Sequence, residues 1–520
     1  MSTVSVVVAK GLSNALMWLG LAAQRHNLRL PDPIACRLRS WLDRLSYDKT
    51  RRLSVADCSS PLIARPDAAG NERGDASALG VAAPVPGPVP DTETHVQHAA
   101  CAFPPAAAPK AATGSLRCVL ATSSLDVGGM DEVVAFLARR LPCQGVRTTV
   151  LHASAHGAPD GRPTGRLGRL LAEHGVETVE RDADAGTRWL AQMRPDVISA
   201  HDPAPWVLDA ASRLSIPYVD TLHGMHSLFS ANWAAEARRS RRLTRIVAVG
   251  ELVRQQYLHG NPAWLPERIV TIPNGVNDQW RPPASRRDAR ARLGLRDEYL
   301  FVSLARHCLQ KNSYGLVAAF ADVAARHPDA HLVIAGRADD PAYFTQLLRL
   351  REALPCRDRI HLRDHTPAPT ALLAAADSFV LDSFFEGWSL ASMEALHAGV
   401  PVVLSEVGGA REQVGEGDER GHVVANPLGD PLRVDWQTIR EARFARQVNR
   451  PALVTAMRSM IVHRALWLDA REDLARESAA RFHPDVCLRR HAEVLAIAAA
   501  EGCPSVEAGA PSALGQQLPV

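Results

Sequence analysis

A large charge of one sign, paired cysteines and long apolar runs are all missing from this chain of 520 residues. The net charge of +3 is small for this length and argues against nucleic acid as a main partner. The nine cysteines form no Cys-x-x-Cys pair and no metal-ligand spacing, so we expect a reduced, cytoplasmic compartment. Aromatic residues make up only 5% of the chain, which is otherwise ordinary for a globular protein. No apolar run reaches the roughly 18 residues that predict a membrane-spanning helix.

Residues 64–114 are rich in alanine, proline and glycine and predict a disordered linker, because such a segment buries too little apolar surface to offset ordering entropy. Residues 1–63 precede it as an N-terminal extension. Within them, residues 34–53 have the pattern of a basic amphipathic helix. Two interpretations are open: the helix lies on an anionic membrane, or it packs on the main body with a solvated basic face. Residues 12–23 lack a clear small-x-small cleavage site, so we do not expect a signal peptide.

The ordered body begins near residue 115, where short apolar runs start to alternate with helical patterns. Runs that are apolar throughout are typical of parallel strands covered on both faces. Two sets of six runs predict an α/β protein with two doubly wound, Rossmann-like domains. The first set covers residues 118–121, 148–151, 196–199, 217–220, 245–249 and 269–272, and the second covers 300–304, 331–335, 360–362, 379–381, 400–404 and 423–424. The predicted parts are an N-terminal domain (115–280), a C-terminal domain (281–465), helices that we expect to cross back to the first domain (466–500) and a tail (501–520).

The most informative stretch covers residues 378–412 and predicts a β–loop–α–β unit with a helix over 390–397. Glu386 lies in its loop and Glu394 on its helix, with Gly387 permitting close backbone approach to a ligand. Two carboxylates at a loop–helix junction can each accept hydrogen bonds from a diol of a sugar. By spacing alone, a solvated helix face is the more common explanation. The position after a buried strand favours a ligand site, because open α/β sheets bind ligands there.

Other strand ends offer further candidates, each with an ordinary structural alternative. Gly128 and Gly129 follow the first strand and suit a diphosphate or a sugar, although most Gly-Gly pairs are turns. His223 ends a strand, where a satisfied structural histidine is the alternative. Arg306 and Lys311 follow the first strand of the second set and suit a leaving diphosphate, or are plain surface cations. His201 is a weaker strand-end candidate.

Asp-x-Asp, a motif that holds a divalent metal in some enzymes, occurs once among the candidate loops, at Asp182 and Asp184. It lies in a polar loop and does not follow a strand, so we predict no metal site.

The stretch contains a Glu-x7-Glu motif that includes Ser383, Glu386, Gly387, Glu394 and Gly399. Through this motif, the chain resembles the retaining, nucleotide-sugar-dependent glycosyltransferases of the GT-B fold often called family 4. It departs from the family pattern at Ala305 and Asn312, where glycine is usual. The resemblance covers roughly residues 116–500 and implies a nucleotide-sugar donor held mainly on the second domain.

The resemblance also implies the role of each candidate residue. Glu394 would bind the ribose diol, Glu386 the donor-sugar hydroxyls, and Arg306 with Lys311 the diphosphate. His223 would border the reaction centre. Donor-binding backbone and loop positions would be Gly387, Trp388, Ser389, Leu390, Gly128 and Gly129.

The implied activity is metal-independent hexosyl transfer with retention of anomeric configuration, to a glycan, a lipid-linked or a small-molecule acceptor. We expect no cofactor, no nucleic acid partner, and a cytoplasmic protein with peripheral membrane contact through the N-terminal basic helix. A competing hypothesis is a non-catalytic nucleotide- or glycan-binding subunit of the same fold. A GT-B sugar-nucleotide epimerase is a third.

Overall fold

The computed structural model describes residues 60–63, 115–123, 125, 129–153, 165–275, 285–366 and 369–504. The predicted basic helix over 34–53, the predicted linker over 64–114, Gly128 and most of the predicted tail lie outside these residues.

The first sheet has seven parallel strands in the order β3-β2-β1-β4-β5-β6-β7. Their bounds are β1 Leu116–Thr122, β2 Val146–Ala153, β3 Thr178–Arg181, β4 Val197–His201, β5 Tyr218–Leu222, β6 Arg245–Ala248 and β7 Ile269–Thr271. The sequence predicted six strands here and missed β3. This edge strand is half-buried along its whole length and includes Glu180 and Arg181, so it has no apolar run to detect.

Helices cover both faces of this sheet, because successive strand residues point to opposite sides. In β1, Cys118 and Leu120 join one buried cluster while Val119 and Ala121 join another. The helices are α3 Gly129–Arg140, α4 Arg166–Glu173, α5 Ala183–Met193, α6 Trp206–Arg213, α7 Trp233–Ser240 and α8 Glu251–Gly260. Short 3₁₀ helices are η2 Leu141–Gln144, η3 Met225–Leu228 and η4 Pro266–Arg268.

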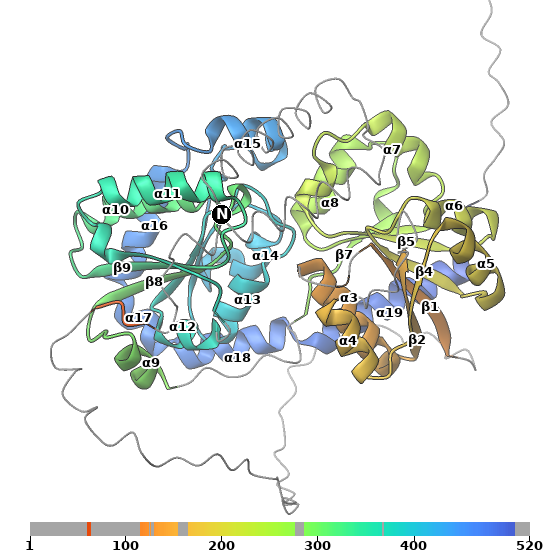
Figure 1. The fold of residues 1–520 in the computed structure, drawn as a ribbon, viewed down its shortest axis with the longest axis horizontal. Coiled ribbons are helices and arrows are strands. Elements are labelled where there is room, and N and C mark those ends of the chain that lie inside the picture. The colour runs from red at the N-terminus through yellow and green to blue at the C-terminus, as the bar shows by residue number, and fades with distance from the viewer. Residues whose placement is uncertain are drawn as a thin grey trace, which may run out of the picture.

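The second sheet has six parallel strands in the order β10-β9-β8-β11-β12-β13. They are β8 Tyr299–Leu304, β9 Ala330–Ala335, β10 Ile360–Arg363, β11 Ser378–Leu381, β12 Val402–Ser405 and β13 Gly421–Val424. The two sheets lie side by side in Figure 1. The prediction of two doubly wound parallel sheets is confirmed.

Helices again cover both faces. They are α9 Arg286–Arg292, α10 Ser313–Ala324, α11 Pro341–Ala353, α12 Pro369–Ala375, α13 Leu390–His397, α14 Ala410–Val414, α15 Trp436–Ala442, α16 Arg450–Val462, α17 Arg464–Asp469 and α18 Arg471–Arg481. The 3₁₀ helices are η5 Leu309–Lys311, η6 Arg357–Arg359, η7 Glu416–Asp418 and η8 Pro431–Arg433. Helix α13 has the predicted bounds, and Ser389 caps it by accepting a hydrogen bond from the Ser392 N–H.

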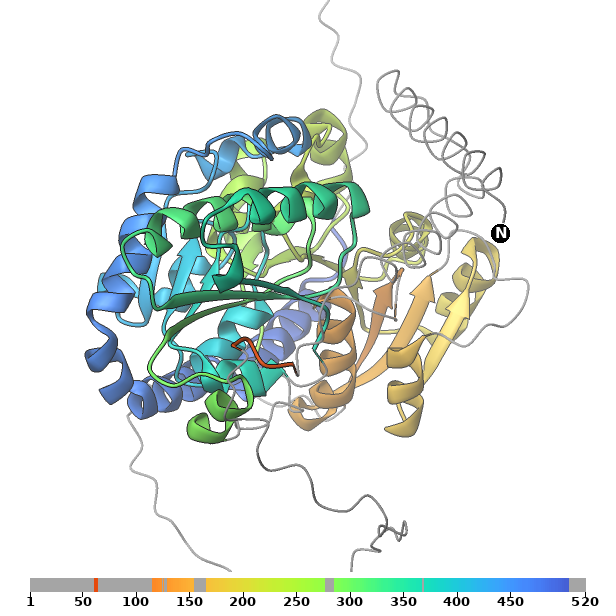
Figure 2. The ribbon, with the colours of Figure 1, turned by 60° about the vertical axis from the view of Figure 1, so that its left-hand side comes forward.

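The last helix, α19 Pro484–Glu501, belongs to the core of the first sheet. Its residues Cys487, Leu488 and Leu495 are buried with the strand residues Leu120 and Val197. In Figure 1, α18 runs below the second sheet and α19 lies behind the first. Figure 2 shows β1 to β3, in orange to yellow, at the edge of the first sheet. The last described helix therefore returns to the half of the molecule that contains β1.

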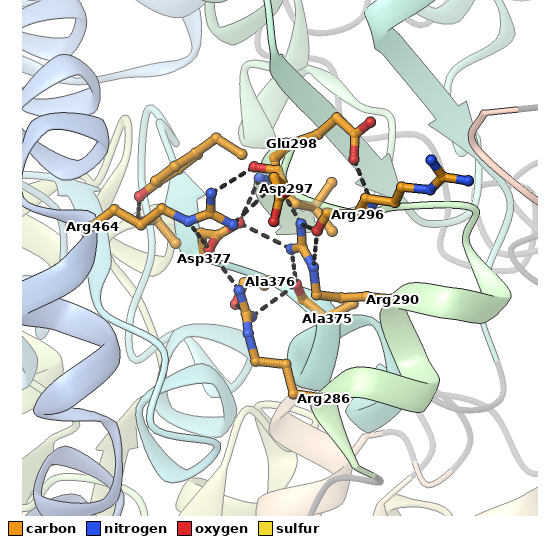
Figure 3. Close-up of polar contacts among 12 residues, drawn as sticks. Arg286, Arg290, Arg296, Asp297, Glu298, Ala375, Ala376, Asp377 and Arg464 are labelled. Carbon is orange, nitrogen blue, oxygen red and sulfur yellow. Dashed lines mark hydrogen bonds and ion pairs between the residues drawn. The ribbon is translucent and has the colours of Figure 1, made fainter.

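The start of β11 is held by a buried ion network (Figure 3). The carboxylate of Asp377 is 1% exposed and accepts from Arg286 at 2.6 Å, Arg290 at 3.1 Å and Arg464 at 2.9 Å. Its Oδ2 also accepts the N–H of Leu300 at 2.8 Å. The network thereby joins α9, β8, β11 and α17, and it fixes the strand from which the Glu386 loop leaves.

Among the described residues, no helix is long and apolar enough to cross a bilayer.

Candidate active site

Three strand ends meet between the two sheets and bring most of the predicted residues together. His223 follows β5, Arg306 and Lys311 follow β8, and Glu386 follows β11. Because all strands of each sheet are parallel, these loops leave at the carboxyl ends, where ligands bind in open α/β sheets.

Glu386 is buried and makes three side-chain contacts on its own half of the molecule. Its Oε1 accepts from Lys311 Nζ at 2.5 Å and from Ser383 Oγ at 2.6 Å, and Oε2 lies 3.4 Å from Gln310 Nε2. Lys311 itself is only 15% exposed. The predicted sugar-binding carboxylate and the predicted phosphate-binding cation thus form one ion pair in the free protein.

Arg306 is the exposed member of the group. It pairs with Asp339 at 2.7 Å and reaches Gln310 Oε1 at 3.1 Å. Gln310 contacts both Arg306 and the Glu386 carboxylate. A polar side chain therefore connects the exposed cation to the buried ion pair.

His223 lies against a second histidine. Its Nε2 is 2.8 Å from Nδ1 of His201, and His201 Nε2 is 3.1 Å from Ser199 Oγ. Burial, followed by the charges of His491 and His226, lowers the pKa of His223 to about 3. Burial and the neighbouring His223 also lower the pKa of His201. Both rings are therefore neutral at physiological pH, and the weaker sequence candidate, His201, orients the stronger one.

Glu394 lies on α13 and faces the start of α3. Burial, reinforced by the negative charge of Glu132, raises the pKa of Glu394 to about 7. Gly129 is the first residue of α3 and Glu132 lies in its first turn. The predicted ribose carboxylate and the described part of the predicted glycine pair thus lie on facing elements; Gly128 is outside the described residues.

Gly387 allows close approach of backbone to backbone, since a Cβ there would lie 1.8 Å from the carbonyl oxygen of His223. Next to it, the Met225 N–H donates to the Glu386 carbonyl at 3.2 Å. Phe385 meets Phe229 edge to face, with 5.0 Å between ring centroids. The loop after β11 therefore contacts the loop after β5 directly, across the boundary between the halves.

The residues after Gly387 have mixed exposure. Trp388 is buried, with Nε1 3.3 Å from Met393 Sδ and its ring against Phe482. Ser389 is the helix cap and Leu390 is the first helical residue. Only backbone at Trp388 is placed to meet a ligand, whereas Ser389 and Leu390 offer a helix N-terminus.

A cavity of about 10 Å³ lies against Glu386, lined also by Ser389 and Gln413. All of its lining residues belong to the second half of the molecule.

Asp182 has a structural role: it is the N-cap of α5 and accepts from the Ala185 N–H at 2.9 Å. Asp182 directly follows β3 and Asp184 lies in the first turn of α5, so the expectations of a polar loop and of no preceding strand are both wrong here. The Asp-x-Asp pattern is explained by helix capping.

The sequence argument missed a buried polar network beneath the Lys311 loop. Asn312 Nδ2 donates to Asp382 Oδ2 at 2.8 Å, and Asn449 Nδ2 donates to Asp382 Oδ1 at 2.7 Å. Gln447 Nε2 donates to Asn312 Oδ1 at 2.7 Å. Asn312 has a φ of 50°, the left-handed conformation that glycine usually supplies and asparagine tolerates. The departure from the family glycine therefore keeps the backbone conformation and adds two side-chain contacts.

The rarity of lysine is a signal that the sequence argument left unused. Lysine occurs only at positions 10, 49, 110 and 311, although lysine and arginine together number 59. Nearly all basic residues of the chain are arginines, so the lysine at position 311 is an exception. A compact ammonium suits the narrow space beside Glu386 better than a planar guanidinium does.

Comparisons with known proteins agree with this geometry. Residues 285–431 match the family model described as glycosyl transferases group 1, and residues 127–280 match the model of glycosyltransferase family 4. The chain is 29% identical over 277 residues to a glycogen synthase of Mycobacterium tuberculosis (strain ATCC 25618 / H37Rv), covering 49% of this chain and 64% of that protein. It is 28% identical over 362 residues to a D-inositol 3-phosphate glycosyltransferase of Streptomyces scabiei (strain 87.22), covering 59% and 78%.

Solved structures share the fold. A glycosyltransferase of Rickettsia africae ESF-5 superposes with a TM-score of 0.59 at 16% identity, over 74% of this chain and 99% of that one. Anabaena Alr3699/HepE in complex with UDP superposes with a TM-score of 0.57 at 17% identity, over 74% and 100%. With both halves matched by family models, the chain belongs to the group 1 glycosyltransferases of the GT-B fold.

Proposed function

We propose that this protein transfers a sugar from a nucleoside-diphosphate sugar to an acceptor hydroxyl, with retention of anomeric configuration and without a metal ion. The observation that supports this most strongly is the contact between the Lys311–Glu386 ion pair and the His223 loop. It joins a cation, a sugar-binding carboxylate and a histidine at the boundary of two sheets. A protein of the same fold, Anabaena Alr3699/HepE, has been solved in complex with UDP and in complex with UDP-glucose.

In this proposal the donor replaces contacts that the free protein makes with itself. Glu394 accepts the ribose diol, for which it must be ionised. Lys311 and Arg306 neutralise the diphosphate as it gains negative charge on leaving. When Lys311 turns to the diphosphate, the Glu386 carboxylate becomes available to the donor-sugar hydroxyls.

The reaction needs no enzyme nucleophile. The acceptor hydroxyl attacks on the face from which the diphosphate leaves, and the leaving phosphate takes its proton. Neutral His223 lies at the boundary between the halves and can hydrogen-bond the donor sugar. Contact of the two halves around the donor orders the reactants and excludes water.

We propose a glycan, a lipid-linked or a small-molecule acceptor, and a cytoplasmic protein in peripheral contact with a membrane. The basis is the amphipathic pattern of residues 34–53, which lies outside the described part of the chain. Liposome flotation of the full chain, compared with a chain starting at Gly114, tests the contact. Equal flotation of the two proteins would contradict it.

The activity itself is tested in two steps. Thermal-shift titration with UDP, GDP and ADP identifies the base, because a bound diphosphate raises the melting temperature by mass action. Donor hydrolysis and transfer are then measured with the matching nucleotide sugars for wild type, Glu386→Gln and the exposed control Glu493→Gln. We expect loss of turnover of about 10²-fold or more in Glu386→Gln alone.

Anomeric proton couplings of the product report retention, and turnover that persists in EDTA supports metal independence. A binding subunit would be established instead if neither wild type nor Glu386→Gln hydrolysed or transferred any donor while both still bound nucleotide or glycan. Formation of an epimerised sugar nucleotide without acceptor would establish an epimerase.

A further inference from the structure

A groove of about 480 Å³ lies on the outer side of the second half, between α10 and α16. These helices pack together through Phe320, Val323, Leu453 and Met457. Figure 1 shows them at the left-hand side of the second sheet, on the side away from the first half. The groove is lined by Asp322, Ala325, Arg326, Arg446, Arg450, Pro451, Val454, Thr455 and Arg458.

Four of these nine lining residues are arginines, against one carboxylate. Arg450 Nε pairs with Asp322 Oδ2 at 2.8 Å, and Arg458 Nη2 donates to the Asp322 carbonyl at 2.8 Å. Arg326 and Arg446 are exposed and make no side-chain hydrogen bond or ion pair with the described part of the chain. The single acid is thus already occupied, and two guanidinium groups face the groove with their donors free.

Like charges gathered in this way repel one another, and a bound anion relieves the repulsion. A guanidinium offers two parallel N–H donors that match two oxygens of one phosphate. Arg326 and Arg446 can each bind a separate phosphate, while Arg450 and Arg458 keep their bonds to Asp322. The chemistry therefore fits a ligand with two or more phosphate groups.

The same segment that supplies two of these arginines also reaches the donor site. Arg446 and Arg450 line the groove, whereas Gln447 and Asn449 between them point inward. Gln447 bonds Asn312, the residue after Lys311, and Asn449 bonds Asp382, four residues before Glu386. A movement of residues 446–450 is thus transmitted by two hydrogen bonds to the loops of Lys311 and Glu386.

We propose that this arginine groove binds a multiply phosphorylated ligand and that its occupancy changes nucleotide affinity at the donor site through Gln447 and Asn449. The binding part is independent of the proposed function, whereas the coupling part rests on it. No residue of the donor site contributes to the groove.

Binding is tested by calorimetry with tripolyphosphate at constant ionic strength. We expect one site per chain, weakened at least about tenfold in Arg326→Ala/Arg446→Ala. Arg349→Ala is the control: it removes an exposed arginine on α11 that does not line the groove, and we expect it to leave the affinity unchanged. Equal weakening in the control, or no binding to wild type, would overturn the proposal. Sedimentation with phosphatidylcholine vesicles, with and without phosphatidic acid, shows whether the phosphate source is a lipid headgroup or a soluble molecule.

Coupling is tested by measuring the Kd of the nucleotide identified by thermal shift, with and without saturating tripolyphosphate. We expect a change of about fivefold or more in wild type, abolished in Arg326→Ala/Arg446→Ala and reduced in Gln447→Ala, which still binds tripolyphosphate. A change that persists in the double variant arises from competition at the donor site and would overturn the coupling. If no nucleotide binds, the proposed function fails, while the calorimetric stoichiometry still decides whether the groove binds phosphate.

Discussion

Single residues of the proposed donor site make contacts within the protein and, in the proposed function, also meet the ligand. Lys311 pairs with Glu386 at 2.5 Å, and Gly387 lies against the His223 carbonyl. Neither contact was predictable from the sequence, because the residues are 75 and 164 positions apart along the chain. What the sequence did predict was the residue types at the strand ends, since a cation, a carboxylate and a glycine each suit one part of a nucleotide sugar.

Lys311→Arg tests whether charge alone suffices at this position. The guanidinium is bulkier and planar, whereas the Lys311 ammonium shares Glu386 Oε1 with a second donor, Ser383 Oγ, and has little room beside it. We expect kcat/KM to fall at least about tenfold, and by about 10²–10³-fold in Lys311→Ala. Steady-state kinetics at several donor concentrations measures both. Wild-type kinetics in Lys311→Arg would show that any cation serves.

Glu394→Gln should raise the free energy of unfolding at high pH and weaken donor binding. The pKa of Glu394 is raised to about 7 by burial, above its ordinary value of 4.5. The folded protein therefore binds the proton of Glu394 more tightly than the unfolded chain does. The contribution of Glu394 to the free energy of unfolding falls as pH rises from 4.5 to 7. Gln does not titrate, so we expect the variant to be more stable than wild type at pH 8, by on the order of 1 kcal/mol after solvent screening.

Below about pH 4.5 the stability difference at this group vanishes, because Glu394 is then protonated in both states. Denaturant titrations at several pH values measure it. A variant less stable than wild type at pH 8 would contradict the raised pKa. The same variant should bind nucleotide more weakly, since an amide replaces the ionised carboxylate at the ribose.

Among the elements, β11 with α13 was predictable and β3 was not. Phe379, Val380 and Leu381 are buried on both sides of the second sheet, so their run is apolar throughout. In β3, only one side of the strand has a neighbour, and Glu180 and Arg181 are half-buried. A sequence pattern reports burial, so an edge strand with little burial leaves no pattern. The helix bounds of α13 were predictable because Ser389 and Gly399 mark its two ends.

Asp377→Ala should detach the start of β11. The substitution leaves Arg286, Arg290 and Arg464 without their shared carboxylate, and Arg290 is itself buried. Removing one partner from a buried ion network costs about 3–5 kcal/mol. We expect the free energy of unfolding of the second half to fall by this amount, so that its transition moves to a lower denaturant concentration. Asp358→Ala, which changes an 88% exposed carboxylate, is the control and should stay within about 0.5 kcal/mol of wild type.

At the scale of the whole molecule, the two halves meet through backbone at glycines and through a small aromatic group. A Cβ on Gly250 would lie 2.9 Å from the Gly409 N, and one on Gly224 would lie 3.4 Å from the Gly387 N. Phe229 packs against both Phe385 and Trp436. The sequence predicted two domains, but the identity of their contacts depends on residues far apart in the chain.

Gly387→Ala should prevent the halves from meeting as they do in the free protein. The added methyl would clash with the His223 carbonyl oxygen. This is a backbone atom, so the clash cannot be relieved by a side-chain rotation. We expect the hydrogen bond from the Met225 N–H to Glu386 to break and its amide to exchange faster. Hydrogen–deuterium exchange of the peptide that contains Met225 measures this. Unchanged exchange would mean that the contact is not a persistent feature in solution.

The return of α19 to the first sheet has a consequence for how the protein is made. The ribosome releases the strands of the first half early, yet Leu488 and Leu495 leave it only after the entire second half. Until then, Leu120 and Val197 lack the α19 part of their buried cluster, although the α3 part is already present. The first half must therefore wait, with an apolar surface uncovered, through the synthesis of some two hundred further residues, about 10–40 s at 5–20 residues per second. Release of a finished first domain ahead of the second is excluded by this topology, and chaperone contact with the nascent chain is expected over that interval.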